Sequence, residues 1–113
     1  MTEKPNSKLE TLATLEQTIK DRATSGGTSS YTSKLLSSGT LVCAKKFGEE
    51  AFELALAAAS EGEANVISEA GDVFYHLLVL LKSRDISLNQ VMDELEKRTS
   101  QSGLEEKASR KNG

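Results

Sequence analysis

The sequence predicts an all-α fold, a single-domain bundle of about five helices with an antiparallel helical hairpin at its centre. Two features of the composition favour helix over sheet: the 113 residues include one proline, and aromatic residues make up only 4%. Apolar residues also recur at helical spacing in several segments. A helical domain of this length buries its apolar faces poorly alone, so we expect dimerisation to complete the bundle.

The N-terminal half of the chain predicts two helices separated by a loop. Residues 1–8 are expected to form a flexible tail. Leucines at helical spacing then predict a helix from Leu9 to about Arg22. The stretch ATSGGTSS interrupts this pattern, because paired glycines and small polar residues favour a loop. A short helix over 31–37 follows, and it ends at Gly39.

Two longer helices are expected to form the hairpin. Thr40 is placed to cap the first of them, over about 41–60. Its apolar stripe has the residues Phe47, Ala51, Leu54 and Ala58. The second helix, over about 64–83, is apolar on most sides and therefore requires cover on several faces.

A last helix is predicted over 88–98, with Ser87 as its cap. Its expected buried residues are Leu88, Val91, Met92 and Leu95. Residues 99–113 are polar and are expected to form a loose C-terminal tail. The functional domain is therefore expected to span 9–98.

Charge is distributed unevenly behind the net value of −3. From Ala23 to Gly48 every charged residue is a lysine, whereas from Glu49 to Asp72 every charged residue is acidic. A nucleic-acid partner would require a continuous basic face, so none is expected. The N-terminus lacks an apolar signal segment, and the longest apolar run is too short to span a bilayer. These features, with the lone Cys43 as a packing residue, predict a cytoplasmic protein that binds no membrane.

Acids from both hairpin helices are predicted to converge. If the helices run antiparallel about Glu61, then Glu50 faces Asp72 and Glu53 faces Glu69. The two acids of each helix are three residues apart and share one face. Crowded carboxylates without a basic partner must take up protons or bind a cation. Hard oxygen donors favour Mg²⁺, with Mn²⁺ as the next choice.

Residues beside these acids have both a functional and a structural interpretation. Glu49 is a candidate to be a further ligand or to hold an attacking water. The same register pairs Lys46 with His76, although a histidine on an apolar helix is more often a core residue than a ligand. An ordinary solvated helix face explains most glutamate pairs, but two matched pairs without a basic residue between them favour a metal site.

The segments SSYTSKLL, KKFGEEAFELALAA and EAGDVFYHLLVLL contain an ExxE motif followed by an ExxD motif. They resemble the all-α, MazG-like nucleoside triphosphate pyrophosphohydrolase superfamily and, within it, the phosphoribosyl-ATP pyrophosphatase family. The resemblance covers about Leu9 to Arg98. It implies a homodimer and Mg²⁺-dependent hydrolysis of phosphoribosyl-ATP to phosphoribosyl-AMP and pyrophosphate, the second step of histidine biosynthesis.

The resemblance also implies roles for individual residues. The metal ligands fall on Glu50, Glu53, Glu69 and Asp72. Glu49, Glu50 and Glu53 are the expected catalytic residues, and the expected substrate-binding residues are Tyr31, Lys34, Lys45 and Lys46. The lysines would attract phosphates, although each has a rival interpretation as a solubilising charge, and Tyr31 either stacks on a base or anchors its short helix. Gly71 departs from the alanine usual in the family.

Two other functions stay open at this stage. The same acids would suit a house-cleaning pyrophosphatase that acts on noncanonical nucleoside triphosphates, which only substrate preference would separate. A non-catalytic helical interaction protein is the second alternative. Folding insensitive to magnesium and no release of pyrophosphate from any nucleotide would favour it.

Overall fold

The computed structural model describes residues 7–25 and 30–100, and all regular structure within them is helical. A 3₁₀ turn, η1 (Ser7–Leu9), precedes five α-helices: α1 (Glu10–Ser25), α2 (Tyr31–Ser37), α3 (Thr40–Ser60), α4 (Glu63–Ser83) and α5 (Leu88–Thr99). The predicted all-α fold is confirmed. Of the tails expected to be loose, residues 1–6 and 101–113 lie outside the described residues. Residues 7 and 8 belong to η1 instead, Thr99 ends α5 and Ser100 is its C-cap residue.

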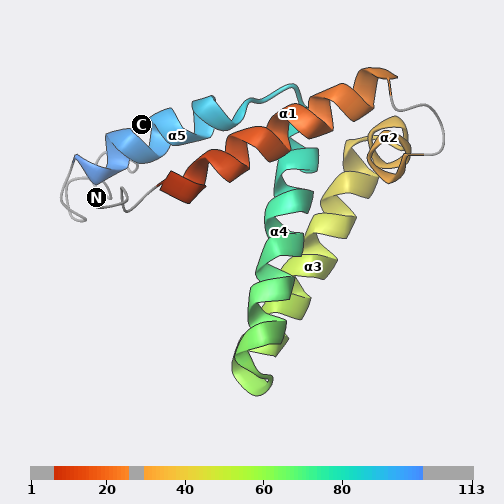
Figure 1. Ribbon diagram of the computed structural model, residues 1–113. Coiled ribbons are helices and arrows are strands. Elements are labelled where there is room, and N and C mark those ends of the chain that lie inside the picture. Colours follow the sequence, from red (N-terminus) through yellow and green to blue (C-terminus); the bar gives the residue numbers. More distant parts are fainter. Residues whose placement is uncertain (1–6, 26–29, 101–113) are drawn as a thin grey trace, which may run out of the picture.

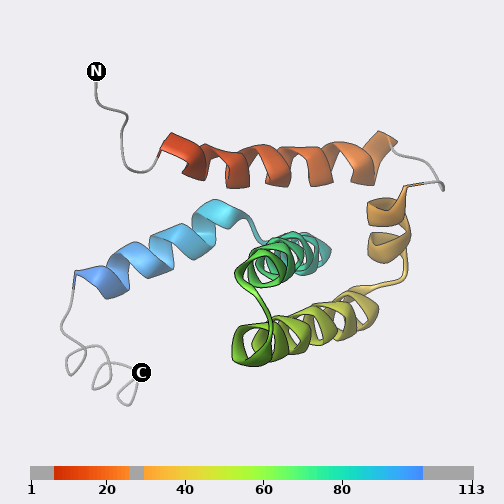
Figure 2. The same cartoon turned by 60° about the horizontal axis from the view of Figure 1, so that its bottom comes forward.

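Helices α3 and α4 form the predicted antiparallel hairpin (Figure 1). Helix α3 ends where Glu61 becomes extended and donates its backbone N–H to the carbonyl of Ala57, and α4 begins after Gly62. Helix α1 crosses the open end of the hairpin and α2 lies beside that end (Figures 1 and 2). The end with the turn projects away from the other described helices, so these helices cover only one half of the hairpin (Figure 1).

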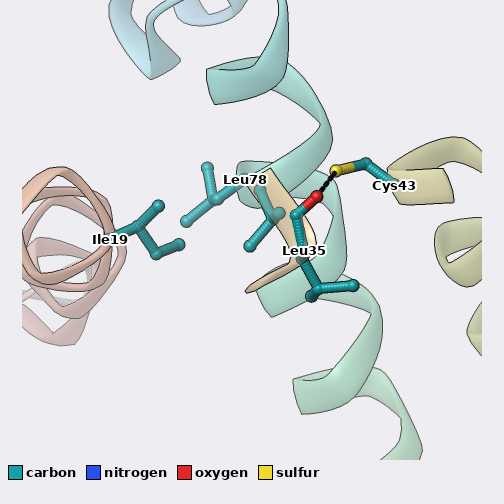
Figure 3. Close-up of a cluster of buried hydrophobic side chains, with 5 residues drawn as sticks. Ile19, Leu35, Cys43 and Leu78 are labelled. Atoms are coloured by element: carbon teal, nitrogen blue, oxygen red, sulfur yellow. Dashed lines mark hydrogen bonds between the residues drawn. The ribbon is translucent and has the colours of Figure 1, made fainter. Parts of the chain in front are cut away.

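The buried core lies at the open end of the hairpin, where four helices meet. Its members are Ile19 of α1, Leu35 of α2, Cys43 of α3, and Leu78 and Val79 of α4. Figure 3 shows the side chains of Ile19 and Leu78 directed toward each other. The thiol of Cys43 donates a hydrogen bond of 3.3 Å to the carbonyl of Leu35, which fits the predicted packing role of this cysteine.

Polar contacts fix the short helices against this core. The hydroxyl groups of Thr32 on α2 and Tyr75 on α4 are 2.5 Å apart. The backbone N–H of Leu88, at the start of α5, donates to a carboxylate oxygen of Glu16 at 2.7 Å. Ser87 caps α5 as predicted, in a capping box with Gln90.

The predicted cap of α3 is wrong. Thr40 is the first helical residue, and Gly39 precedes it as the N-cap residue with φ 96°. Glycine adopts such a positive φ without a Cβ clash, which allows the tight turn from α2 into α3. The hydroxyl of Thr40 instead donates to the hydroxyl of Ser83 at 3.0 Å and links the open ends of the hairpin.

The predicted burial of α5 is also wrong within a single chain. None of its residues is buried: Leu88 and Val91 are half-buried, while Met92 and Leu95 are exposed. The apolar pattern was read correctly as one face of a helix. The other described helices, however, do not cover that face.

Apolar side chains are exposed on the projecting part of the hairpin as well. Phe52 and Leu56 of α3 and Ile67 and Phe74 of α4 expose between 48% and 65% of their surface. Helix α4 is long and apolar enough, by those two criteria alone, to cross a membrane. It packs along α3 and carries Glu69 and Asp72 in its middle, a position where charge is costly in lipid.

Candidate metal and nucleotide site

One polar stripe runs along each helix of the hairpin. On α3 it contains Lys46, Glu50 and Glu53, and on α4 it contains Glu69, Asp72 and His76. Steps of three and four residues keep each set on one side of its helix. We call the two stripes together the polar seam.

Three acids of the polar seam meet in space. Glu50, Glu69 and Asp72 each offer a carboxylate oxygen, and these oxygens lie within 4.8 Å of one another. None of the three forms an ion pair with a basic residue in the described part of the chain. The cluster is partly accessible, because Glu50 and Glu69 are half-buried and Asp72 is exposed. A small ligand therefore has access to it.

The electrostatics of the cluster favour a cation. Partial burial raises the pKa of Glu50, and the charges of Glu53 and Asp72 raise it further. The pKa of Glu69 is raised in the same way, first by desolvation and then by Glu53 and Asp72. A cation between these carboxylates would stabilise their charged forms and lower both pKa values.

One carboxylate oxygen of Glu69 indicates that the cluster is suited to a metal ion. The Oε2 atom of Glu69 is buried and has no hydrogen-bond partner among the described residues, although other parts of the residue reach solvent. A buried carboxylate oxygen without a partner is costly, and coordination to a cation would satisfy it. Three carboxylates also match the hard-oxygen donors of Mg²⁺ and leave positions for water and phosphate. The residues present fit a divalent metal ion.

Glu53 stands apart from the three converging acids. It is exposed and is not part of the cluster within 4.8 Å. Its charge nevertheless acts on both Glu50 and Glu69, so it borders the same space. In addition to the expected facing of Glu50 and Asp72, Glu50 also lies close to Glu69, so that one acid of α3 meets both acids of α4.

The predicted basic residues and Glu49 lie around the cluster at different places. Lys46 pairs with Glu49 at 3.5 Å, and both are about half exposed. Lys45 is two turns before the exposed Phe52 and shares that side of α3, not the side of the polar seam. Lys34 is exposed on α2 and forms no ion pair with a described residue.

An aromatic group lies beyond the acids, toward the open end of the hairpin. The rings of Tyr31 and Tyr75 are stacked, with centroids 6.4 Å apart and planes at 19°. His76 meets both rings edge-on, at 6.2 Å from Tyr31 and 5.0 Å from Tyr75. Of these three residues, the sequence pattern predicts a substrate contact for Tyr31 alone, and it pairs His76 with Lys46. The spacing of His76, one turn after Asp72, was the available signal that the polar seam continues to this group.

Comparison with known proteins agrees with the resemblance of the motifs. The family profile described as phosphoribosyl-ATP pyrophosphohydrolase matches residues 12–99. Phosphoribosyl-ATP pyrophosphatase 1 of Rhodopseudomonas palustris is 57% identical over 101 residues, which are 89% of this chain and 94% of that protein. The protein of the same name from Bradyrhizobium diazoefficiens is 56% identical over 101 residues, 89% of this chain and 95% of that one. The matched segment includes the whole polar seam.

Proposed function

The chain belongs to the phosphoribosyl-ATP pyrophosphohydrolase family, and we propose that it hydrolyses phosphoribosyl-ATP to phosphoribosyl-AMP and pyrophosphate. This reaction is the second step of histidine biosynthesis and takes place in the cytoplasm. The observation that carries the proposal is the convergence of Glu50, Glu69 and Asp72 around a buried oxygen without a partner. An anhydride between two phosphates requires a strong positive centre to open, and these acids are suited to hold one.

We assign the metal ligands to Glu50, Glu53, Glu69 and Asp72, and the metal to Mg²⁺, with Mn²⁺ as a substitute. A divalent ion held by these residues would neutralise charge on the phosphates and lower the pKa of a bound water. Glu53 belongs in the set because its charge acts on the same space, although its side chain is exposed.

The other residues of the site bind and orient the reactants. Glu49 accepts a hydrogen bond from the attacking water, which places the water oxygen toward a phosphorus atom. Lys46, which pairs with Glu49 at 3.5 Å, offers a positive charge to the phosphate oxygens at the edge of the acids. Lys34 and Lys45 extend this positive field. The water oxygen forms a bond to one phosphorus while the bond from that phosphorus to the bridging oxygen breaks. The bridging oxygen leaves with the other phosphate, and a proton of the water is released to solvent.

We further propose that the chain acts as a homodimer. The exposed apolar residues of the projecting hairpin and the uncovered face of α5 support a second copy as the missing cover. A hairpin with an exposed apolar side on each helix becomes a four-helix bundle when two copies pair.

The function is tested by measuring pyrophosphate release from phosphoribosyl-ATP, ATP and deoxynucleoside triphosphates, with Mg²⁺ and with EDTA. We expect release from phosphoribosyl-ATP alone, dependent on Mg²⁺, and a loss of about a hundredfold or more in Glu50→Gln. Comparable release from ordinary triphosphates would indicate a house-cleaning pyrophosphatase. No release from any nucleotide would leave the helical interaction protein as the better reading.

A further inference from the structure

The aromatic group at the open end of the hairpin has an exposed side that the fold does not use. Tyr75 is anchored, because its hydroxyl bonds to Thr32, and His76 exposes only 7% of its surface. Tyr31 exposes 53%. A tyrosine that served only to fasten α2 to α4 would gain more by burying its ring. The exposed ring of Tyr31 is instead held in place by two rings behind it.

The position of this group relates it to the acids. Glu69, Asp72 and His76 follow one another along one side of α4, and His76 lies one helical turn, about 6 Å of rise, beyond Asp72. His76 is close enough to Asp72, Lys46 and Glu49 for their charges to act on it. The acids and the aromatic rings are therefore two ends of the same polar seam.

A nucleotide has the same order of chemical groups as this seam. Its phosphates require cations and its base offers a flat π-face, with a sugar between them. Aromatic side chains bind bases by stacking, and an exposed ring with a fixed orientation loses little entropy when it does so.

We propose that the substrate lies along the hairpin with its adenine base stacked on Tyr31, at the end near α2, and its phosphates at the acids toward the turn. Tyr31 contacts the base. Tyr75 and His76 are positioning residues that hold the ring of Tyr31. This inference rests on the proposed function, because it requires the phosphates to lie at Glu50, Glu69 and Asp72.

Two matched inhibitors test the placement of the base. AMP and ribose 5-phosphate share a sugar and a phosphate and differ in the base. Each is measured as an inhibitor of phosphoribosyl-ATP hydrolysis by the wild type, Tyr31→Phe and Tyr31→Leu. We expect AMP to inhibit the wild type about tenfold more strongly than ribose 5-phosphate. The advantage should persist in Tyr31→Phe, which keeps the ring, and disappear in Tyr31→Leu.

The kinetic constants and a control variant separate stacking from general damage. Tyr31→Leu should raise KM for phosphoribosyl-ATP about tenfold with a smaller change in kcat. Leu9→Ala is the control, because Leu9 is similarly exposed, at 61%, but lies in η1, outside the hairpin. It should retain the advantage of AMP.

The result that overturns the proposal is equal inhibition by the two ligands in the wild type, or an AMP advantage that survives in Tyr31→Leu. Either result leaves the proposed function intact, since hydrolysis of phosphoribosyl-ATP is measured in the same assay. Failure of the proposed function would appear differently, as a wild-type protein that releases no pyrophosphate from phosphoribosyl-ATP.

Discussion

Glu50 of α3 and Glu69 of α4 place carboxylate oxygens within 4.8 Å of each other, and no described basic residue forms an ion pair with either. Like charges at this separation repel, and the partial burial of both groups increases the cost. A bound metal ion would attract both carboxylates and offset the repulsion between them. Mg²⁺ should therefore stabilise the folded protein, with an increase of about 10 °C in Tm at a concentration one hundred times the Kd.

Glu69→Gln provides the matched variant for this measurement. The substitution keeps the shape of the side chain and removes one charge. We expect the variant to be more stable than the wild type in EDTA and to gain little from added Mg²⁺. Thermal unfolding followed by circular dichroism would show both effects. An equal gain in Tm for the two proteins would exclude Glu69 from the metal site.

The raised pKa values of Glu50 and Glu69 also predict a dependence of stability on pH in the absence of metal. A carboxyl group whose pKa is higher in the folded state favours folding while it is protonated. This contribution is present below the ordinary pKa of 4.5 and is lost as the pH rises through the raised folded values.

The difference in unfolding free energy between wild type and Glu69→Gln isolates this effect. In EDTA, the wild type should lose stability relative to the variant as the pH rises from about 4 to 7. Excess Mg²⁺ should reverse the trend above the folded pKa values. A difference that does not change with pH would show that the folded pKa of Glu69 is not raised.

The buried core predicts where truncation is most damaging. Ile19 exposes 1% of its surface and packs against the core at the open end of the hairpin. Ile19→Ala should lower the free energy of unfolding by about 2–5 kcal/mol, because it removes buried methyl groups and leaves a cavity. Urea unfolding measures this value. Leu9→Ala is the control, since Leu9 is 61% exposed and should change stability by less than about 1 kcal/mol.

The exposed hairpin predicts a different effect for its apolar residues. Phe52 exposes 63% and Ile67 exposes 65%, so neither stabilises the single chain to any large extent. Phe52→Ser combined with Ile67→Ser should shift the protein from dimer to monomer in sedimentation equilibrium, and should make Tm independent of protein concentration. Leu9→Ser removes a similarly exposed side chain elsewhere and should remain a dimer. A fully dimeric double variant would place the interface on another surface.

The sequence predicted the helices and the acidic motif well because both depend on local periodicity. Helical spacing located α3 and α4 to within a residue or so, and the three-residue step put Glu69 and Asp72 on one face. The additional approach of Glu50 to Glu69 was beyond the sequence. A flat drawing of the hairpin gives each acid one partner, whereas packed helices cross and rotate, so that Glu50 reaches both acids of α4.

The errors at α5 and at Thr40 have separate causes. The apolar spacing of Val91, Met92 and Leu95 identifies a face but does not say which surface covers it, or whether that surface belongs to the same chain. Thr40 has the right chemistry for a cap, but Gly39 supplies the positive φ that the turn requires. The aromatic group was missed because Tyr31 and His76 are distant in sequence and are brought together only by the packing of α2.

Lys45 and Lys46 match the same family motif but lie on different sides of α3. Lys46 lies one turn from Glu50 in the polar seam, while Lys45 shares the side of Phe52. A lysine that holds a phosphate oxygen contributes a charged hydrogen bond, so Lys46→Ala should lower kcat/KM for phosphoribosyl-ATP about tenfold or more. Lys45→Ala should have a smaller effect, because its charge acts from a greater distance through solvent.

Both variants remove one positive charge, so each is the control for the other. The measurement of kcat/KM is repeated at high salt, which screens long-range attraction. If Lys45→Ala proved the more damaging at every salt concentration, the substrate would approach the acids from the outer side of α3.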